Sequence, residues 1–422
     1  MTNDPRTTAH VIDGVDSLGL VGAVEHLVAM PSLGGSDAEV DIQDDLARQW
    51  DRAGFNVTTW DIDVAAMAAA PDFPGMEVER TAARGLIARL PGTGEGPTLL
   101  LLGHTDVVPA GDRSAWAEDP FRPVLRGDRL LGRGACDMKA GMASLWYAAL
   151  ALRDSGVRLR GDVVLAAVSG EEDGGLGTYA LLQEGITADA CIIPEPTSLD
   201  LIPANGGALT FRLTIRGRAT HASRRTEGVS AIEKFLPVLE ELHRLEARRN
   251  DVVDPLMQRW PIAYPLSIGT IQAGDWASTV PDLLTAEGRL GVAIGETPAQ
   301  AREDLEQTLA RLSADDPWLA EHPIEIEWWG GQFASGRTDP QHPLVGSLGE
   351  VVADVRGVTP QVYGGPYGSD LRLLVAAGIP TVHFGPGESA AAHAPNEWVD
   401  VRETVDCARA LAAYAVRFCG LS

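Results

Sequence analysis

The hydrophobic pattern of the chain changes near residue 208, and this change constrains the fold more than any other feature of the sequence. Before it, short apolar runs bounded by Gly and Pro alternate with segments of helical periodicity. The apolar runs lie at 56–62, 85–90, 98–103, 162–168 and 190–193, and the helical segments at 16–30, 36–54 and 141–156. Short apolar runs of this kind are typical of buried strands. Their alternation with helices predicts an α/β sheet covered by helices.

From residue 208 the pattern is typical of strands with one solvated face, because apolar and polar residues alternate between Ala208 and Arg216. The elements expected after it are a helix at 228–247, strands at 265–273 and 283–292, a helix at 298–313 and a strand at 324–328. This order is the split unit of a ferredoxin-like α+β domain. The first pattern returns at 343–356, 360–363, 368–377, 380–384 and 402–418. We therefore predict an α/β domain in two parts, 1–207 and 327–422, with an α+β domain inserted at 208–326.

Length and composition narrow the class of protein. A chain of 422 residues exceeds what one hydrophobic core usually organises, which supports two domains. Its formal net charge of −25 repels phosphate backbones, so a nucleic-acid partner is not expected. The four cysteines form no CxxC pair and are expected to be reduced. The sequence has neither a signal-peptide pattern nor a run of about 20 apolar residues, so we expect a cytoplasmic protein without a membrane partner.

The first potential metal ligand is His104, in the segment Gly-His-Thr-Asp at the end of the apolar run 98–103. Open α/β sheets bind ligands at the carboxyl ends of their strands. Asp106, two positions on, is well placed to accept the other ring N–H of His104 and so to orient the imidazole. A structural histidine followed by a turn aspartate explains the segment equally well when it is taken alone.

Carboxylates follow in two further segments. Asp137 lies in a glycine-rich loop, where it can cap the helix that follows, bridge two metals, or do both. Glu171 and Glu172 follow the run 162–168, and two adjacent carboxylates resist joint ionisation unless a cation compensates them. One of the pair can bind metal while the other acts as a general base. An acidic surface turn is the more common explanation for such a pair in isolation.

Glu195, held between two prolines, and His393, after a glycine loop, complete the set of candidate ligands. Together the segments supply two histidines, one aspartate and two glutamates, with a spare glutamate beside one of the ligands. This inventory fits two zinc ions about 3.5–4 Å apart, bridged by a carboxylate and a water. Cobalt or manganese suits the same donors. Imidazole and carboxylate donors without thiolate argue against a structural zinc site.

The order of these motifs resembles that of the co-catalytic zinc amidohydrolases and metallopeptidases, a family that includes acetylornithine deacetylase, succinyl-diaminopimelate desuccinylase, aminoacylase and glutamate carboxypeptidase. The motifs run from residue 103 to residue 397, so the resemblance covers nearly the whole chain. It implies a zinc-peptidase-like catalytic domain with a mixed sheet. It also implies the following roles: Asp137 bridges both zinc ions, His104 and Glu195 complete one site, Glu172 and His393 complete the other, Glu171 is the general base, and Asp106 orients His104.

The same resemblance implies that the inserted domain is a lid that carries homodimerisation. In the family, a histidine at the position of His221 reaches into the partner subunit's site and stabilises the oxyanion of the reaction. Taken alone, His221 is explained as the end of a surface strand.

Four residues are candidate substrate contacts. Arg372, in the segment 368–372, and Arg289, on a lid strand, have the planar guanidinium that binds a carboxylate. For each of them a solvated charge or a local ion pair is an equal alternative. Ser278 lies where many relatives carry Asn, which changes the hydrogen bonds on offer to a substrate amide. Gly365 is the fourth candidate.

These observations predict a hydrolase that cleaves the amide bond of a small N-acyl amino acid or peptide-like substrate with two zinc ions. A dipeptidase or carboxypeptidase with the same site is the alternative enzyme. An inactive metal-binding dimeric scaffold is the alternative of another class, and the intact Glu171 argues against it because a scaffold needs no general base. Dinucleotide binding is not favoured, since no GxGxxG follows a predicted strand.

Overall fold

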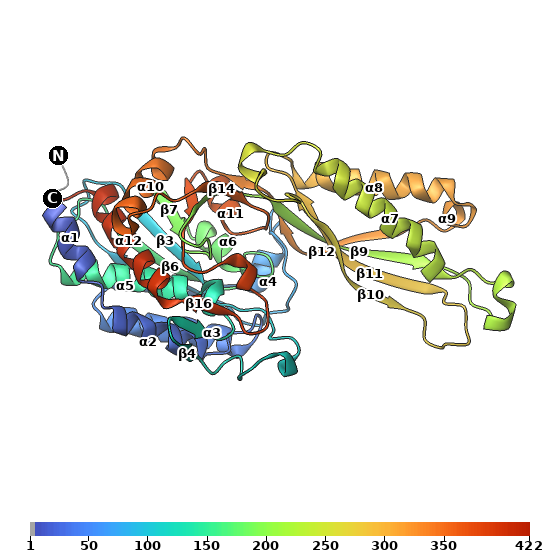
Figure 1. Ribbon diagram of the computed structural model, residues 1–422, viewed down its shortest axis with the longest axis horizontal. Coiled ribbons are helices and arrows are strands. Elements are labelled where there is room, and N and C mark those ends of the chain that lie inside the picture. Colours follow the sequence, from blue (N-terminus) through green and yellow to red (C-terminus); the bar gives the residue numbers. More distant parts are fainter. Residues whose placement is uncertain (1–4) are drawn as a thin grey trace.

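A nine-stranded mixed sheet forms the centre of the larger domain in the computed structural model, which describes residues 5–422 (Figure 1). Residues 1–4 of the predicted first segment, 1–207, lie outside the described residues. The strands run in the order β1-β2-β6-β3-β7-β15-β8-β13, and β14 also pairs with β8. Their bounds are β1 (Asn56–Asp61), β2 (Arg84–Leu90), β3 (Leu99–His104), β6 (Val163–Val168), β7 (Ala190–Ile193), β8 (Leu201–Asn205), β13 (Gly336–Arg337), β14 (Val362–Gly365) and β15 (Thr381–His383).

The central strand β3 pairs in parallel with β6 and β7, whereas β2 pairs antiparallel with β1 on one side and with β6 on the other. The sheet is therefore mixed, and the predicted α/β fold class is confirmed. Successive side chains of a strand point to opposite faces, so Leu99 and Leu101 pack into one core while Leu100 and Leu102 pack into another. A strand buried on both faces is apolar at every position, which explains the continuous apolar runs in the sequence.

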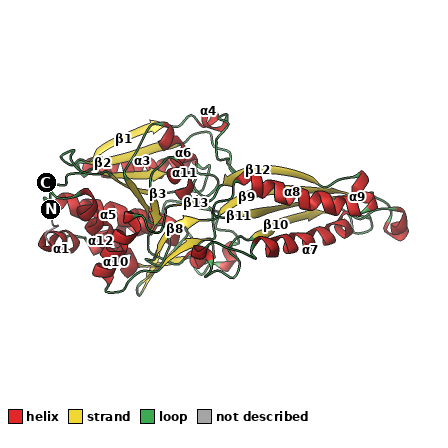
Figure 2. Ribbon diagram, turned by 90° about the horizontal axis from the view of Figure 1, so that it is seen from above, coloured by secondary structure: helices red, strands yellow, loops and turns green. Residues whose placement is uncertain are grey.

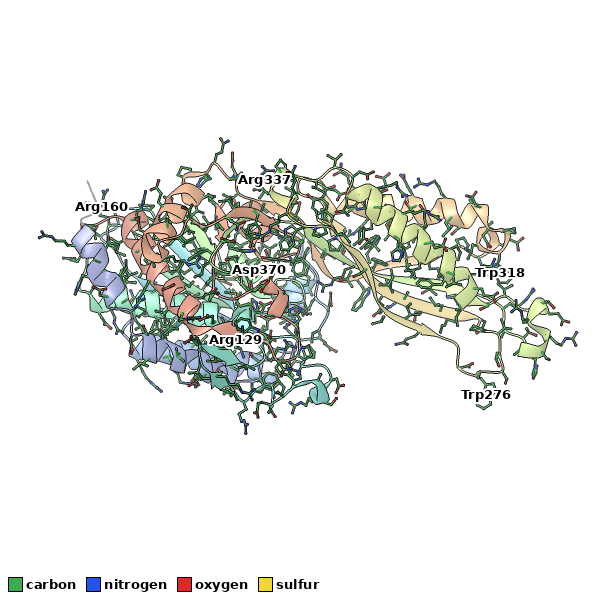
Figure 3. The ribbon with its side chains drawn as sticks, in the orientation of Figure 1. Arg129, Arg160, Trp276, Trp318, Arg337 and Asp370 are labelled. Atoms are coloured by element: carbon green, nitrogen blue, oxygen red, sulfur yellow. The ribbon has the colours of Figure 1, made fainter. Side chains whose placement is uncertain are left out.

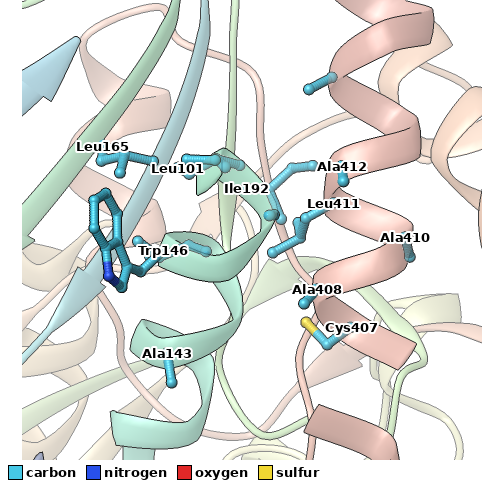
Figure 4. Close-up of a cluster of buried hydrophobic side chains, with 14 of the residues drawn as sticks. Leu101, Ala143, Trp146, Leu165, Ile192, Cys407, Ala408, Ala410, Leu411 and Ala412 are labelled. Atoms are coloured by element: carbon cyan, nitrogen blue, oxygen red, sulfur yellow. The ribbon is translucent and has the colours of Figure 1, made fainter. Parts of the chain in front are cut away.

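Helices cover both faces of this sheet (Figures 1 and 2). Figure 4 shows one of the two cores, where Leu101, Leu165 and Ile192 of the strands face Trp146 of α5 and Leu411 of α12. The helices that contribute to this core are α1 (Pro5–Asp13), α2 (Ser17–Val28), α3 (Asp37–Arg52), α5 (Ala140–Asp154), α10 (Pro343–Arg356) and α12 (Val401–Cys419). The opposite face is covered by α6 (Leu176–Gln183) and α11 (Leu371–Ala376), and α4 (Val64–Ala68) lies beside α6.

A small three-stranded sheet joins two distant parts of the chain next to the large sheet. It consists of β4 (Val124–Arg126), β5 (Arg129–Leu131) and β16 (Trp398–Asp400), in the order β16-β5-β4. Single helical turns complete the structure: η1 (Arg113–Ala115), η2 (Ala135–Lys139), η3 (Ala222–Glu227), η4 (Pro255–Met257) and η5 (Ser389–Ala391). Pairing of β5 with β16 brings the loop that contains Asp137 next to the loop that contains His393.

The second domain, the lid, is a four-stranded antiparallel sheet in the order β10-β11-β9-β12 with helices on one face, and it extends away from the larger domain (Figures 1 and 2). Leu209, Phe211 and Leu213 of β9 pack beneath these helices, and the residues between them face the other side. Its elements are β9 (Gly207–Arg216), α7 (Ala231–Arg249), β10 (Leu266–Ala273), β11 (Leu283–Val292), α8 (Pro298–Asp315), α9 (Pro317–Glu321) and β12 (Glu325–Phe333). The last strand thus continues past residue 326, through an irregularity between Trp328 and Gln332.

A connecting loop, residues 72–80, lies between the larger domain and the lid. The backbone N–H of Gln332, in β12, donates to the carbonyl oxygen of Pro74 at 2.8 Å. Gly75 has φ of +87°, and a Cβ there would lie 1.9 Å from the carbonyl oxygen of Gly330. Only glycine allows this approach, so the loop is held closely against the lid strand.

No helix within residues 5–422 is both long and apolar enough to cross a membrane.

Candidate metal centre and active site

The candidate ligands gather at one edge of the large sheet, where three neighbouring strands end. His104 is the last residue of β3, Glu171 and Glu172 follow β6, and Glu195 follows β7. Because parallel strands end at the same edge, these four side chains come together although 91 positions of sequence separate the first from the last. Asp137, in η2, and His393, after η5, reach the same place from the loops that the small sheet joins.

The two carboxylate oxygens of Asp137 face two different histidines. Its Oδ1 lies 3.0 Å from Nε2 of His104, and its Oδ2 lies 3.5 Å from Nε2 of His393. Nε2 of His104 is also 3.7 Å from Oε1 of Glu195, and Nε2 of His393 is 2.9 Å from Oε2 of Glu172. The donors therefore form two groups that share one aspartate, which is the arrangement that a bridging carboxylate needs.

The carboxylates of this cluster are buried close together, so they need positive charge nearby to be ionised. Burial raises the pKa of Glu171 and of Glu195 well above the ordinary value of a glutamate, and burial with the charge of Asp137 raises the pKa of Glu172. Hydrogen bonds to Asp137 and Glu172 raise the pKa of His393 to about 11. Divalent cations would replace these protons and relieve the repulsion among the carboxylates. The nitrogen and oxygen donors fit a pair of such ions.

The contacts of the Asp106 side chain differ from those expected. Nδ1 of His104 lies 3.0 Å from the main-chain oxygen of Asp106 and 3.6 Å from its carboxylate. The carboxylate oxygens instead accept from the backbone N–H groups of Glu171 at 3.3 Å and Glu172 at 3.2 Å. Asp106 thus contacts the imidazole mainly through its backbone, and its side chain holds the adjacent glutamates in place.

A buried ion pair ties the loop of Asp137 to the loop of His393. Arg133 donates to Glu397 at 2.6 Å, and both side chains are fully enclosed. The other carboxylate oxygen of Glu397 accepts from the backbone N–H of Cys136 at 2.8 Å and of Asp137 at 3.1 Å. Arg133 also donates to the carbonyl oxygen of His393 at 3.2 Å, a residue with φ of +60°. The motifs in the sequence end at residue 397, but they gave no indication that Glu397 pairs with Arg133.

A second buried network lies behind the glutamate pair and was not predicted. Arg80 donates to Glu39 at 2.9 Å and to Asp173 at 2.8 Å. Asp173, next to Glu172 in sequence, also accepts from the backbone N–H groups of Glu77 at 3.1 Å and Val78 at 2.8 Å. The connecting loop is therefore fastened directly to the loop that carries Glu171 and Glu172. Sequence patterns carried no signal for this pairing.

A cavity of about 640 Å³ opens over this cluster, between the larger domain and the lid. Its lining includes Glu171 and the carboxylate ligands on one side and lid residues such as Arg289 and Phe333 on the other. Tyr367 also lines it, and the Tyr367 hydroxyl is buried without a hydrogen-bond partner among residues 5–422. The rest of the residue forms part of the cavity wall, while the hydroxyl itself is covered by neighbouring atoms. Tyr367 lies between the predicted elements 360–363 and 368–377 and was not a predicted site residue.

Arg372 does not take the place expected of a residue that binds a substrate carboxylate. Its guanidinium is buried, donates to the carbonyl oxygens of Ser369 and Gly174 at 2.7 Å each, and stacks 4.1 Å from the ring centre of Phe333. The residue is not part of the cavity lining. The local signal, a small hydroxyl residue followed by Asp and Arg, could not reveal that backbone carbonyls occupy the guanidinium.

Gly365, the other candidate substrate contact in this part of the chain, lies in β14. It does not line the cavity, whereas the next residue, Pro366, does.

His221 and Ser278 lie together at the far end of the lid. His221 forms an isolated bridge with Thr279, and the backbone N–H of Ala222 donates to the carbonyl oxygen of Ser278 at 2.8 Å. Both segments adjoin the turn of Trp276, which Figure 3 places at the end of the lid remote from the larger domain. Neither residue lines the cavity of its own chain.

Comparison with known proteins identifies the family. The family described as Peptidase family M20/M25/M40 matches residues 100–417, and the chain belongs to it. The chain is 29% identical over 406 residues to an N-formyl-4-amino-5-aminomethyl-2-methylpyrimidine deformylase of Bacillus subtilis (strain 168), covering 90% of this chain and 89% of that protein. It is 28% identical over 340 residues to an acetylornithine deacetylase of Myxococcus xanthus, covering 79% and 84%.

Among solved structures, the dipeptidase Dug1p of Saccharomyces cerevisiae matches with a TM-score of 0.77 and 16% identity over 98% of each chain, which shows the shared fold. The relatives in sequence are amidohydrolases and peptidases, so this protein is a metal-dependent amide hydrolase. A dinuclear metal site fits its donors.

Proposed function

We propose that this protein removes the acyl group from a small N-acylated substrate by hydrolysis of the amide bond, with two zinc ions as its cofactor. The observation that carries the proposal is the sharing of Asp137 between two groups of donors, with a carboxylate oxygen of Glu171 within 4.8 Å of donor atoms of His104 and Glu195. In this assignment His104 and Glu195 hold one metal, Glu172 and His393 hold the other, and Asp137 bridges them. Cobalt and manganese are the alternative ions, because they accept the same donors.

Glu171 is the proton carrier of the proposed reaction. When bound, the metal pair supplies Lewis acidity for the acyl carbonyl and lowers the pKa of water to about 7. The carboxylate of Glu171 accepts the proton of the attacking water and later donates it to the nitrogen of the departing amine. Burial raises the pKa of Glu171 in the metal-free protein, and bound cations would lower it again, so that the carboxylate can accept the proton of water. The products are a carboxylate and a free amine, so water is the only co-reactant.

The choice of deacylation over peptide cleavage rests on the relatives in sequence. One is named for removing a formyl group from an aminomethylpyrimidine and another for removing the acetyl group of acetylornithine. The N-acyl amino acid expected from the sequence belongs to the same general class of substrates, the acylated amines. A dipeptidase or carboxypeptidase is the second candidate, and the likeness of the fold to Dug1p favours it.

We also propose that the protein is a homodimer in which His221 of one subunit completes the site of the other. The position of His221 at the far end of the lid supports this, because the residue is exposed and distant from the cavity of its own chain. There it would donate a hydrogen bond to the oxyanion of the tetrahedral intermediate. The four cysteines are free and buried, which supports a reducing, cytoplasmic location.

The test is a substrate panel with purified protein loaded with zinc, cobalt or manganese. It should contain N-formyl and N-acetyl derivatives of simple amines and of amino acids, with dipeptides as the comparison. We expect release of formate or acetate from at least one acylated amine, at a metal content of two ions per chain. Faster cleavage of dipeptides than of every acylated amine would favour the second candidate. Metal binding without hydrolysis of any amide would favour the scaffold and reject the proposal.

A further inference from the structure

The lid side of the cavity contains one ion pair that joins the two domains. Arg289, in β11, donates to Oε1 of Glu77, in the connecting loop, at 2.9 Å. Both residues line the cavity. The pair is partly open to solvent, with side-chain exposures of 44% for Arg289 and 24% for Glu77. A guanidinium facing a substrate cavity normally suggests recognition of a carboxylate, yet here a protein carboxylate already occupies that position.

The permanent cations of the cavity lining are already paired, which disfavours a second anion. Seven lining residues are Asp or Glu, of which Asp137, Glu172 and Glu195 are assigned to the metals, and two lining residues, Arg80 and Arg289, carry a permanent positive charge. Arg80 is bound to Glu39 and Asp173, and Arg289 is bound to Glu77. Neither arginine of the described lining is therefore left to neutralise a substrate carboxylate.

Glu77 is held in place by more than its ion pair. Its Oε1 also accepts from the hydroxyl of Thr210, in β9, at 2.8 Å, and its backbone N–H donates to Asp173 at 3.1 Å. A Cβ on Gly330 would lie 2.4 Å from Cγ of Glu77, so the glycine makes room for this side chain. A carboxylate fixed in this way cannot swing aside, and a substrate anion that took Arg289 would leave Glu77 unpaired beside it.

We propose that the Glu77–Arg289 pair determines substrate specificity, excluding acylated amines that carry a free carboxylate and favouring those whose amine part is uncharged or cationic. The inference rests on the proposed deacylase function and narrows its substrate class. It departs from the N-acyl amino acid that the sequence predicts. Like charges brought together without a compensating cation are the physical reason for the exclusion.

A matched pair of substrates tests this inference. N-formylbenzylamine and N-formylphenylglycine differ only by one carboxylate, and release of formate measures the hydrolysis of both. For the zinc-loaded wild type we expect kcat/KM to be about tenfold or more higher for N-formylbenzylamine. The substitution Glu77→Gln keeps the shape and removes the charge, so it should shift this ratio about tenfold toward N-formylphenylglycine, mainly through a lower KM.

Two further variants control the experiment. Glu287 of β11 forms the next ion pair along the same face of the lid sheet, with Arg212, and lies outside the cavity lining. Glu287→Gln should therefore leave the ratio unchanged. Arg289→Met leaves the negative charge of Glu77 without its partner, so it should shift the ratio further toward N-formylbenzylamine.

Three outcomes would overturn the inference. They are a wild-type preference for N-formylphenylglycine, an unchanged ratio in Glu77→Gln, and a shift of the ratio toward N-formylphenylglycine in Arg289→Met. Failure of the proposed function looks different, since the metal-loaded wild type would then hydrolyse neither these two substrates nor any acylated amine of the panel, and the inference would fall with it.

Discussion

The two domains of this protein differ in how deeply their charged side chains are buried. The large sheet is buried on both faces, and at its edge it encloses carboxylates and imidazoles whose pKa values depart far from their ordinary values. The lid sheet is covered on one face only, and the charges on its other face form ion pairs that are open to solvent, partly for Arg212 with Glu287 and largely for Arg216 with Glu325. Exposed pairs are strongly screened by water. We infer that the larger domain carries the reacting groups. The lid of the same chain contributes to the shape and charge of the cavity through which a substrate reaches them.

The sharpest test of this division is the substitution Glu171→Gln in the larger domain. It removes the proton carrier and leaves the ligand pairs of His104 and His393 intact, so turnover should fall by about 10²–10⁴-fold. Metal content, measured by mass spectrometry of the loaded protein, should stay at the wild-type value. Turnover within a few-fold of the wild type would show that another group carries the proton.

The substitution His221→Ala asks whether the lid also takes part in the chemistry. If His221 of the partner subunit donates to the oxyanion, turnover should fall by about 10²–10³-fold. Mixing inactive His221→Ala and Glu171→Gln subunits should restore part of the activity, because one site of each mixed dimer has both residues intact. An unchanged rate, or no recovery in a mixture shown by native mass spectrometry to contain mixed dimers, would remove the lid from the chemical step.

A smaller effect is expected from Glu397→Gln, which weakens the ion pair with Arg133 and the support of the Asp137 loop. Such supporting contacts typically change metal affinity by about 10–100-fold. Competition with a fluorescent chelator measures the affinity. Glu118→Gln, which removes a carboxylate from exposed ion pairs with Arg122 and Arg126, is the control and should bind metal as the wild type does. Equal affinities of the two variants would argue against a supporting role for Glu397.

The last prediction concerns stability and not activity, and it rests on His383, a buried residue whose Nε2 lies 3.0 Å from the hydroxyl oxygen of Ser369. Burial lowers the pKa of His383 from 6.5 to about 3, so the folded state resists a proton that the unfolded state binds. The free energy of unfolding should therefore fall as the pH decreases from 6.5 toward 3, by ~1.4 kcal/mol per pH unit from this residue. In urea titrations of the metal-free protein, His383→Gln should show a shallower decline. The same slope in both proteins would contradict this contribution.

Much of the fold was predictable because its strands are local patterns. The runs that became β3, β6 and β7 are apolar throughout, and the alternation from Ala208 marked the start of the lid sheet. The helix α6 was missed because its residues Leu176–Leu181 are buried on all sides, so the segment has no amphipathic period. The strands β4, β5 and β16 have three residues each and carry no pattern that a sequence window can detect.

The candidate site shows the same limit. The motifs of His104, Asp137, Glu172, Glu195 and His393 follow strands or glycine loops, and the structure brings these side chains together. The cavity charge was not predictable. Glu77 and Arg289 are 212 positions apart, and neither residue has a neighbour in sequence that indicates its partner.

The sequence by itself determined which donors the site contains and in what order the strands deliver them, because strand ends and glycine loops are properties of short segments. Only the tertiary structure decided which charges meet: Arg372 with backbone carbonyls, Arg289 with Glu77, and Asp106 with the backbone of the glutamate pair. The physical reason is that the partner of a side chain depends on the distance between packed elements, and hydrophobic periodicity carries no information about that distance.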